Sequence, residues 1–191
     1  MDKFPEEQGN GAYEEAQGLI VKITGGFYYV DLGDRVLECR ARGVFRKRET
    51  TPLVGDHVIA AVLPDDKGYV MEVLPRKNAL QRPPVANLDQ LVLIVSVAEP
   101  APNLLVLDKL IAISEHQDLE PVLIFTKCDL ADVAPYAEIY RKAGFTVAET
   151  SSAEHRGTDA VRDLLAGKVS AFCGNSGAGK STLLNEICPE L

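Results

Sequence analysis

Eight residues near the end of the chain, GNSGAGKS at 174–181, restrict its possible folds more than any other feature. The pattern G-x-x-x-x-G-K-[ST] needs a strand before it and a helix after it, and SAFC at 170–173 and STLLNEI at 181–187 have the composition of both. Glycines let the backbone turn several N–H groups toward one anion, and the helix N-terminus adds partial positive charge. We therefore predict a phosphate-binding loop (P-loop) in an α/β domain. A glycine-rich turn that only caps a helix is the alternative.

The residues of this loop have different expected contacts. Lys180 would reach the β- and γ-phosphates of a nucleotide, and the Ser181 hydroxyl would ligate Mg²⁺. Thr182 lies in the first helical turn and could donate a hydrogen bond to the α-phosphate. The predicted phosphate-binding residues are Gly174, Asn175, Ser176, Gly177, Ala178, Gly179, Lys180, Ser181 and Thr182.

A second motif, Thr126-Lys127-Cys128-Asp129, follows the apolar run at 122–125. We predict that run to be a buried strand, and α/β folds place ligand contacts at the carboxyl ends of such strands. The Asp129 carboxylate could accept hydrogen bonds from N1–H and the 2-amino group of guanine, whereas adenine would leave it unpaired. The aliphatic part of Lys127 could pack along the purine. A Lys-x-Asp turn on the surface is the common alternative for so short a motif.

A third motif, Ser151-Ser152-Ala153, follows the next predicted strand at 145–148 and precedes a predicted helix. A backbone N–H of Ser152 or Ala153 could meet the O6 carbonyl of guanine there. These base-reading motifs precede the P-loop, which reverses the usual GTPase order. Strands of one sheet remain neighbours whatever their order along the chain, so a circular permutation would preserve the site.

The C-terminal half of the chain alternates apolar strands with amphipathic helices, which indicates βαβ units and a mainly parallel sheet. The predicted strands are 91–97, 122–125, 145–148 and 169–173, and the predicted helices are 104–117, 134–143, 158–165 and one from Lys180.

The N-terminal half instead has short strands separated by Gly, Asp and Pro, at 19–24, 27–32, 36–41, 57–63 and 69–74. That pattern favours a five-stranded barrel of the OB type, which commonly presents a strand face and loops to RNA. An SH3-like barrel is the alternative. The predicted divisions are a disordered acidic tail at 1–17, the barrel at 18–75, a linker at 76–86 and a partial nucleotide-binding domain at 87–191.

The charge distribution limits the partners of the chain. Its formal net charge is −8, which argues against a protein that coats nucleic acid along its whole surface. A local run of basic residues suits docking at one phosphate-rich place, although such runs are often only solvated loops. The run consists of Arg40, Arg42, Arg46, Lys47 and Arg48.

No apolar run is long enough to cross a bilayer, and the polar N-terminus is no signal peptide, so we expect a cytoplasmic protein without a membrane partner. The scattered cysteines are expected to be free thiols.

The combination of a small barrel, RKN…LQRPPVANLDQ, TKCD, SSA and GNSGAGKSTLLN resembles the ribosome small-subunit-dependent GTPases of the RsgA type. The resemblance implies an OB-fold, a circularly permuted GTPase domain and a C-terminal zinc domain. It implies a GTPase that binds the small ribosomal subunit late in its assembly and is stimulated by the ribosome. It also implies GTP or GDP and Mg²⁺ as ligands, 126–129 as the guanine-specificity motif, 174–182 as the phosphate loop and ribosomal RNA against barrel residues 46–48.

The chain departs from the family pattern because it ends at Leu191, one helix after the P-loop. In the family the switch regions, a D-x-x-G motif and a zinc-binding Cys/His cluster follow that helix, so we expect these 191 residues to hydrolyse GTP weakly or not at all. We expect a monomer, although an uncovered sheet edge could promote self-association. Two alternatives stay open: an RNA-binding barrel with a vestigial nucleotide site, and an ATP-dependent P-loop enzyme such as a kinase, which the TKCD motif opposes.

Overall fold

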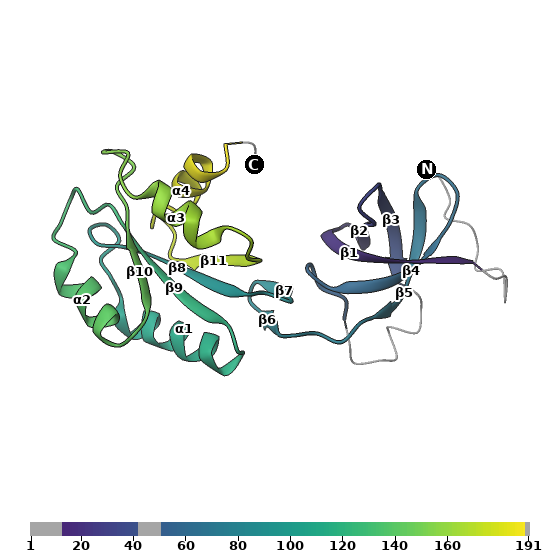
Figure 1. Ribbon diagram of the computed structural model, residues 1–191, viewed down its shortest axis with the longest axis horizontal. Helices are drawn as coiled ribbons and strands as arrows, with labels where there is room; N and C mark the ends of the chain where they lie inside the picture. The colour runs from purple at the N-terminus through teal and green to yellow at the C-terminus, as the bar shows by residue number, and fades with distance from the viewer. Residues whose placement is uncertain (1–12, 42–50, 190–191) are drawn as a thin grey trace. The chain divides into compact units, whose positions relative to one another are not determined.

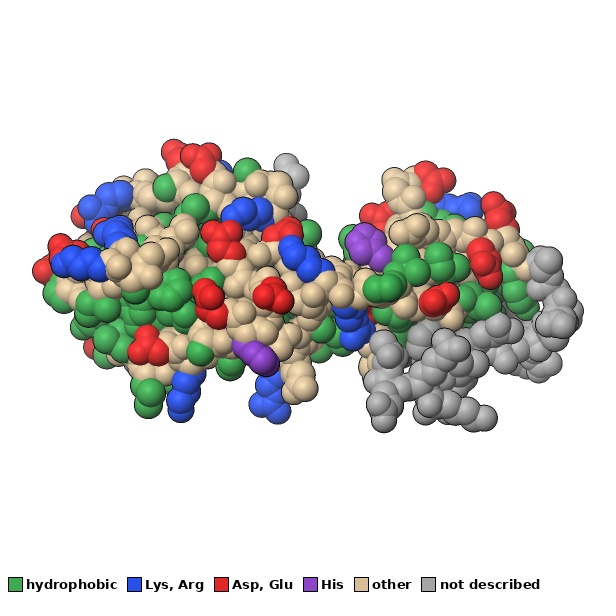
Figure 2. Space-filling model, turned by 60° about the horizontal axis from the view of Figure 1, so that its bottom comes forward, with side chains coloured by type: hydrophobic (Ala, Val, Ile, Leu, Met, Phe, Trp, Pro, Cys, Tyr) green, Lys and Arg blue, Asp and Glu red, His purple; other side chains and the backbone are tan. Residues whose placement is uncertain are grey.

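The computed structural model describes residues 13–41 and 51–189, and its contacts divide the chain into two compact units, Met1–Asn87 and Leu88–Leu191. Among the described residues, no helix is long and apolar enough to cross a bilayer. Figure 2 shows acidic and basic side chains interspersed over the surface that faces the viewer, without one wide basic field.

The first unit contains a closed barrel (Figure 1). Its strands are β1 (Glu14–Thr24), β2 (Phe27–Asp31), β3 (Val36–Ala41), β4 (His57–Val62) and β5 (Lys67–Val73). They follow the order β1-β2-β3-β5-β4 around the barrel, and the pairing of β1 with β4 closes it. β3 and β5 pair in parallel. The barrel is therefore of the predicted OB type and not the SH3-like alternative.

Alternate residues of these strands point into the barrel, as the period of two along a strand requires. The side chains that form its core are fully buried and apolar: Ile20, Val30, Leu37, Cys39, Val58, Ala60 and Val70. The turn from β1 to β2 is Gly25-Gly26, whose φ angles are +59° and +81°. Glycine adopts this left-handed region without the steric cost that a side chain would add. This turn permits the tight antiparallel pairing of the first two strands.

The start of β1 corrects one expectation. β1 begins at Glu14, inside the segment 1–17 that we expected to be a disordered tail. Glu14 lies opposite Val62 and Gln17 lies opposite Ile59 in the antiparallel ladder with β4. The pairing with β4, rather than the hydrophobicity of these polar residues, therefore holds this part of the strand. Residues 1–12 lie outside the described part of the chain.

The expected linker at 76–86 contains a short hairpin that the sequence did not predict. Its strands are β6 (Ala79–Gln81) and β7 (Pro84–Ala86), which pair antiparallel. Val85 also forms a β-bridge with Val54, just before β4. The hairpin is thus tied to residues of the first unit.

An ion pair fixes the chain ahead of this hairpin. The Asp56 side chain is completely buried and accepts two hydrogen bonds from the Arg76 guanidinium, from Nε and from one terminal nitrogen, both at 2.7 Å. Asp56 also accepts from the backbone N–H of Leu53 at 2.7 Å. The hydrogen bond to Asp56 raises the pKa of Arg76. Two-pronged pairing of this kind has a fixed geometry, so it positions the segment that leaves β5.

The second unit is a four-stranded parallel sheet with helices on both faces (Figure 1). Its elements are β8 (Gln90–Ser96), α1 (Leu104–His116), β9 (Glu120–Thr126), α2 (Ala134–Lys142), β10 (Thr146–Glu149), α3 (Thr158–Leu165), β11 (Ser170–Gly174) and α4 (Lys180–Ile187). The strand order is β10-β9-β8-β11. α1 and α2 cover one face, and α3 and α4 cover the other (Figure 1). These elements confirm the predicted βαβ organisation.

The core of this unit explains why its strands read as unbroken apolar runs. A strand covered by helices on both faces buries every side chain, whichever way it points. Val92, Ile94, Val122 and Ile124 pack in one cluster with residues of α3 and α4, while Leu107 of α1 is also buried. All four strands are parallel, so their carboxyl ends and the loops that follow them lie at one edge of the sheet.

Candidate functional site

The P-loop has the backbone that its glycines predict. β11 ends at Gly174, and α4 begins at Lys180. Gly177 and Gly179 have φ angles of +77° and +88°, which side-chain-bearing residues rarely adopt. A Cβ atom on Gly174 would lie 2.3 Å from the carbonyl oxygen of Ile94 on β8. The first glycine therefore permits close packing on the neighbouring strand, and the other two permit the curl of the loop.

Lys180 lies across the inside of this curl. Its Nζ donates to the carbonyl oxygens of Gly174 at 2.6 Å and Asn175 at 2.7 Å. Ser181 and Thr182 follow in the first turn of α4, and both are exposed. An ammonium group, free N–H groups of a helix start and two hydroxyls are the groups that a magnesium-bound polyphosphate needs. Within residues 13–41 and 51–189, no group of three or more His, Cys, Asp or Glu could hold a metal ion.

Thr126 connects the TKCD motif to the P-loop directly. Its Oγ1 donates to the carbonyl oxygen of Ala178 at 2.7 Å, across 52 residues of sequence. Thr126 is 5% exposed and Ala178 is 1% exposed. A buried carbonyl that lost this donor would be costly to leave unpaired. This hydrogen bond therefore joins two motifs that lie far apart in the sequence.

The Asp129 carboxylate is held by Ser151. Ser151 is fully buried, and its Oγ donates to Asp129 Oδ1 at 2.5 Å. The same Oγ accepts from the backbone N–H of Glu154 at 3.2 Å, and Ser151 pairs with Arg156 in a β-bridge. The hydrogen bond from Ser151 lowers the pKa of Asp129, and its own backbone N–H and the charge of Arg156 act in the same direction. These contacts favour the ionised form of the carboxylate and hold Oδ1 against Ser151.

Lys127 connects the motif to a loop that the sequence did not single out. Its backbone is left-handed, with φ at +61°, and its Nζ donates to the carbonyl oxygen of Glu99 in the loop between β8 and α1. The next residue, Pro100, lies against the P-loop, because a Cβ on Gly177 would meet its Cδ at 3.5 Å. The β8–α1 loop thus contacts both motifs.

These contacts enclose a cavity of about 200 Å³. Its lining combines all three predicted motifs: Thr126, Lys127, Asp129, Leu130, Ser152, Ala153, Gly179 and Thr182. Cys128 is not among the lining residues; its thiol donates to the carbonyl of Phe125 at 3.4 Å, and burial raises its pKa. The Cys128 side chain thus makes its contact within the turn after β9 and does not line the cavity.

Three contributors were absent from the predicted site. Ser151 was read only as the start of its motif, although its place one residue before Ser152 was the available signal. Leu130 lines the cavity, but nothing in the sequence distinguishes it from other surface leucines. Glu99 contributes only its backbone carbonyl, and the sequence carries no signal for such a contact.

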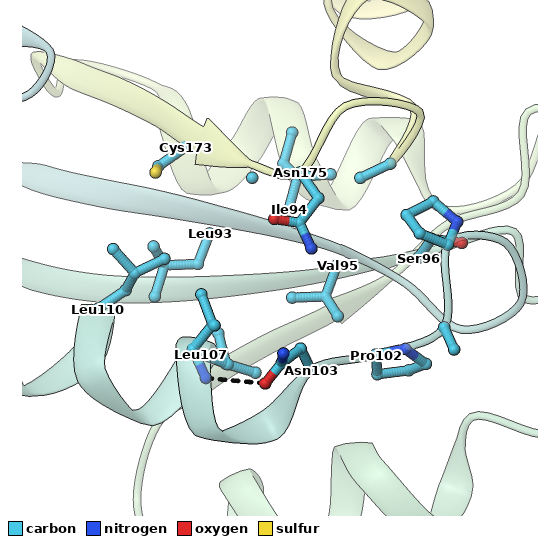
Figure 3. Close-up of a pocket in the computed structure, with 15 residues that line it drawn as sticks. Leu93, Ile94, Val95, Ser96, Pro102, Asn103, Leu107, Leu110, Cys173 and Asn175 are labelled. Atoms are coloured by element: carbon cyan, nitrogen blue, oxygen red, sulfur yellow. Dashed lines mark hydrogen bonds between the residues drawn. The ribbon is translucent and has the colours of Figure 1, made fainter.

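A second, smaller cavity of about 30 Å³ adjoins the P-loop on the α1 side of the sheet (Figure 3). Leu93 and Val95 of β8 and Leu107 of α1 point into it, and Asn175 of the P-loop lies at its other side (Figure 3). Its lining is mostly apolar, and it lacks the charged groups that a phosphate requires.

The predicted RNA-binding residues are only partly described. Arg40 lies on β3 and is exposed. Arg42, Arg46, Lys47 and Arg48 lie outside the described residues.

Comparison with known proteins relates both units to one family. Residues 73–191 match the model of the RsgA GTPase, and residues 17–70 match that of the RsgA N-terminal domain. The small ribosomal subunit biogenesis GTPase RsgA of Geobacillus thermodenitrificans is 42% identical over 182 residues, which cover 92% of this chain and 62% of the relative. The protein of the same name from Bacillus cereus is 43% identical over 181 residues, with the same coverage.

Solved structures agree with this relationship. The crystal structure of YjeQ from Thermotoga maritima superposes with a TM-score of 0.79 at 32% identity, over 93% of this chain and 66% of that chain. The crystal structure of YloQ, a circularly permuted GTPase, has a TM-score of 0.73 at 40% identity, over 92% of this chain and 65% of that chain. The present chain spans about three fifths of the length of the curated relatives that it matches. Because the GTPase family model alone matches more than half of the 191 residues, the chain belongs to the RsgA GTPase family.

Proposed function

We propose that this chain binds GTP and GDP with Mg²⁺, and that it acts in the assembly of the small ribosomal subunit as part of a circularly permuted GTPase. The hydrogen bond from Thr126 to Ala178 at 2.7 Å carries the proposal. It brings the TKCD motif, which we expect to read guanine, against the P-loop, although the two motifs occur in reversed order along the chain. A P-loop alone would fit many nucleotides, and a Lys-x-Asp turn alone would fit none.

The phosphate side of the site would work through charge and backbone donors. Lys180 would leave its present carbonyl partners to contact the β- and γ-phosphates, while loop N–H groups would surround the anion. Ser181 would ligate Mg²⁺, whose charge would offset that of the phosphates. Thr182 lines the cavity and would contact the α-phosphate.

The base side would select guanine over adenine. The Asp129 carboxylate is an acceptor, and the hydrogen bond from Ser151 that lowers its pKa favours this ionised form. Guanine offers two donors to such a group, N1–H and the 2-amino group. Adenine offers an acceptor at N1, which would face a carboxylate that has lost its water. Sites built on hydrogen bonds of this kind discriminate strongly, because the wrong ligand leaves polar groups unpaired.

The names of the relatives support the biological part of the proposal. The curated relatives are small ribosomal subunit biogenesis GTPases, so we assign the same process to this chain. The barrel would contact ribosomal RNA, and Arg40 is the described basic residue of the predicted patch.

The test is an equilibrium titration of the chain with fluorescent GDP in Mg²⁺, followed by competition with unlabelled GDP, GTP and ADP. GDP and GTP should displace the probe at similar concentrations, and ADP should need at least a hundredfold more, given the unpaired groups that adenine leaves. Lys180→Ala should abolish binding, and Lys168→Ala, a change of equal charge on a different loop, should not. Displacement by ADP as readily as by GDP would contradict the proposal.

A further inference from the structure

Thr126 adjoins both the TKCD motif and the P-loop at the cavity of about 200 Å³. It lies three residues before Asp129, and a Cβ atom on Gly179, just before α4, would lie 3.7 Å from its Oγ1. In a guanine nucleotide, N9 carries the ribose and shares the five-membered ring with N7. A base with its Watson–Crick edge on Asp129 and its phosphates in the P-loop would therefore place that ring beside Thr126.

The Thr126 hydroxyl has no proton left for a base. A threonine hydroxyl carries one proton, and Thr126 donates it to the Ala178 carbonyl oxygen at 2.7 Å. The other polar neighbour, the Val95 carbonyl oxygen at 3.4 Å, is also an acceptor. Thr126 and Ala178 are both buried, so a hydroxyl that turned away would leave the Ala178 carbonyl without a partner. The hydroxyl thus stays turned toward the protein and offers a ligand only oxygen lone pairs.

The ammonium group of Lys127 is held away from the edge of the base. Among the described residues that line the cavity, the side chains with a proton to donate are Thr126, Lys127, Ser152 and Thr182. Lys127 Nζ donates to the carbonyl oxygen of Glu99. With its aliphatic stem along the face of the purine, this group would lie off the ring plane, in which the N7 lone pair points.

Ser152 and Thr182 belong to the two ends of the ligand. Ser152 follows Ser151, whose Oγ donates to Asp129 at 2.5 Å, so its place would be beside the Watson–Crick edge. Thr182 lies in the first turn of α4, where the phosphates would bind. Neither hydroxyl would lie beside the five-membered ring. N7 would therefore face the lone pairs of Thr126 Oγ1.

The two acceptors on this side of guanine, O6 and N7, differ in their expected partners. O6 can accept from the backbone N–H of Ser152 or Ala153, as the sequence motif predicts. N7 would lose its bound water on entering the cavity and would meet another acceptor, the Thr126 oxygen. A polar atom buried without a partner costs free energy, and a C–H group at the same place avoids that cost. Replacement of N7 by C–H should thus be neutral or favourable.

We propose that this site reads guanine by its Watson–Crick edge and O6 alone, that it accepts guanine nucleotides without an acceptor at position 7, and that Thr126 sets this tolerance. The inference rests on the proposed function, because it states which atoms of the guanine are recognised. Thr126 would act as a positioning residue for the P-loop and not as a base contact. An amide side chain at this position would differ, since it carries two N–H protons and could donate to Ala178 and to N7 together.

The test is displacement of fluorescent GDP from the 191-residue chain by unlabelled GDP and by 7-deaza-GDP, in Mg²⁺. The deaza analogue has C–H in place of N7 and keeps both the Watson–Crick edge and O6. It should displace the probe at the same concentration as GDP or at a lower one. A loss of affinity of about threefold or more, within the effect of one lost hydrogen bond, would show that the site donates to N7 and would overturn the inference.

Variants at position 126 test the assignment to Thr126. Thr126→Asn supplies a second donor, so it should prefer GDP over 7-deaza-GDP about fivefold. Thr126→Ser keeps a hydroxyl with one proton, and its affinities for the two nucleotides should remain equal. If Thr126→Asn binds GDP and 7-deaza-GDP equally well, Thr126 does not set the tolerance.

Ser152→Ala removes the other hydroxyl that lines the cavity near Asp129, and it should leave the ratio of the two affinities unchanged. A ratio that moves in Ser152→Ala would assign an N7 contact to Ser152 and overturn the inference. Circular dichroism and GDP binding would show whether Thr126→Asn keeps its fold and its site. If it loses either, the unaltered chain, Thr126→Ser and Ser152→Ala still decide the outcome through their affinity ratios.

Competition by ADP in the same samples distinguishes failure of this inference from failure of the proposed function. Rejection of ADP together with a clear preference for GDP over 7-deaza-GDP in the unaltered chain would overturn only the inference. Displacement by ADP as readily as by GDP, or no binding of GDP at all, would contradict the proposed function and the inference with it.

Discussion

The Asp129 carboxylate depends on one neighbouring hydroxyl. Ser151 donates to it at 2.5 Å from a fully buried position, and this bond is the largest cause of its lowered pKa. A lowered pKa means that the ionised form is favoured in the folded protein. Asp129 therefore stays charged below the pH at which an ordinary aspartate takes up its proton. Any stability that it contributes is present above its unfolded-state pKa and is lost as the pH falls through the folded one.

Removal of that hydroxyl should change the pH dependence of binding. We expect Ser151→Ala to raise the pKa of Asp129 toward its ordinary value and to weaken GDP binding at neutral pH about fivefold, the effect of one lost hydrogen bond. The acid limb of the GDP affinity profile should therefore move to higher pH. Ser152→Ala removes the neighbouring hydroxyl at the cavity wall; it could lower affinity but should leave the acid limb in place. The same acid limb in both variants and the unaltered chain would show that Ser151 does not control Asp129.

At the scale of elements, the site is the meeting of loops from neighbouring strands. β9 ends in the TKCD motif and β11 ends in the P-loop, with β8 between them. Thr126 Oγ1 lies within reach of both neighbours, donating to Ala178 at 2.7 Å and approaching the carbonyl oxygen of Val95 at 3.4 Å. The Thr126 hydroxyl thus fixes the P-loop relative to the TKCD motif. A residue without a hydroxyl at this position would leave the buried Ala178 carbonyl unpaired.

Thr126→Val tests this connection with almost no change of shape. We expect about a tenfold loss of GDP affinity, because the Ala178 carbonyl loses its buried donor and the P-loop loses its anchor. Thr126→Ser keeps the hydroxyl and should bind nearly as well as the unaltered chain. The measurement is the same fluorescent GDP titration. Equal affinities of the Val and Ser variants would mean that the hydroxyl has no part in forming the site.

The barrel depends on a different connection, between Asp56 and Arg76. Breaking a buried ion pair leaves one charge uncompensated, so Asp56→Ala should lower the free energy of unfolding of the first unit by about 3 kcal/mol. Urea unfolding followed by circular dichroism would measure it. Glu138→Ala breaks the exposed pair with Lys142 and should cost less than about 1 kcal/mol. A loss for Asp56→Ala as small as that of the control would show that the pair does not hold the hairpin segment.

The sequence predicted the elements whose signals are local. α3 has the predicted limits, Thr158–Leu165, because its apolar spacing lies within the segment itself. β6 and β7 were missed because RKNALQRPPV reads as a basic, proline-containing linker. Their pairing depends on partners elsewhere, the Val54 bridge and the Asp56–Arg76 pair. The early start of β1 was missed for the same reason, since polar residues there are held by β4.

At the scale of the whole molecule, each of the two units has its own hydrophobic cluster. The cavity lined by the predicted motifs belongs to the second unit. The motifs that line the cavity could be placed from sequence, because motifs at the carboxyl ends of parallel strands must meet at one edge of the sheet. Their connections could not be, since hydrogen bonds such as Ser151 to Asp129 and Thr126 to Ala178 depend on loop conformations. Sequence patterns therefore predicted which motifs meet at one cavity better than which hydrogen bonds hold them there.

The central claim is that Asp129 reads guanine in a cavity shared with the P-loop. The most direct measurement is competition of GDP and XDP for Asp129→Asn and for the unaltered chain, by the fluorescent titration. Xanthine has a carbonyl in place of the 2-amino group of guanine. The side-chain amide of the variant could donate a hydrogen bond to that carbonyl, whereas the Asp129 carboxylate has no donor. We predict that the unaltered chain prefers GDP, and that the variant loses most of its GDP affinity and gains affinity for XDP. An unchanged preference for GDP in Asp129→Asn would contradict the account.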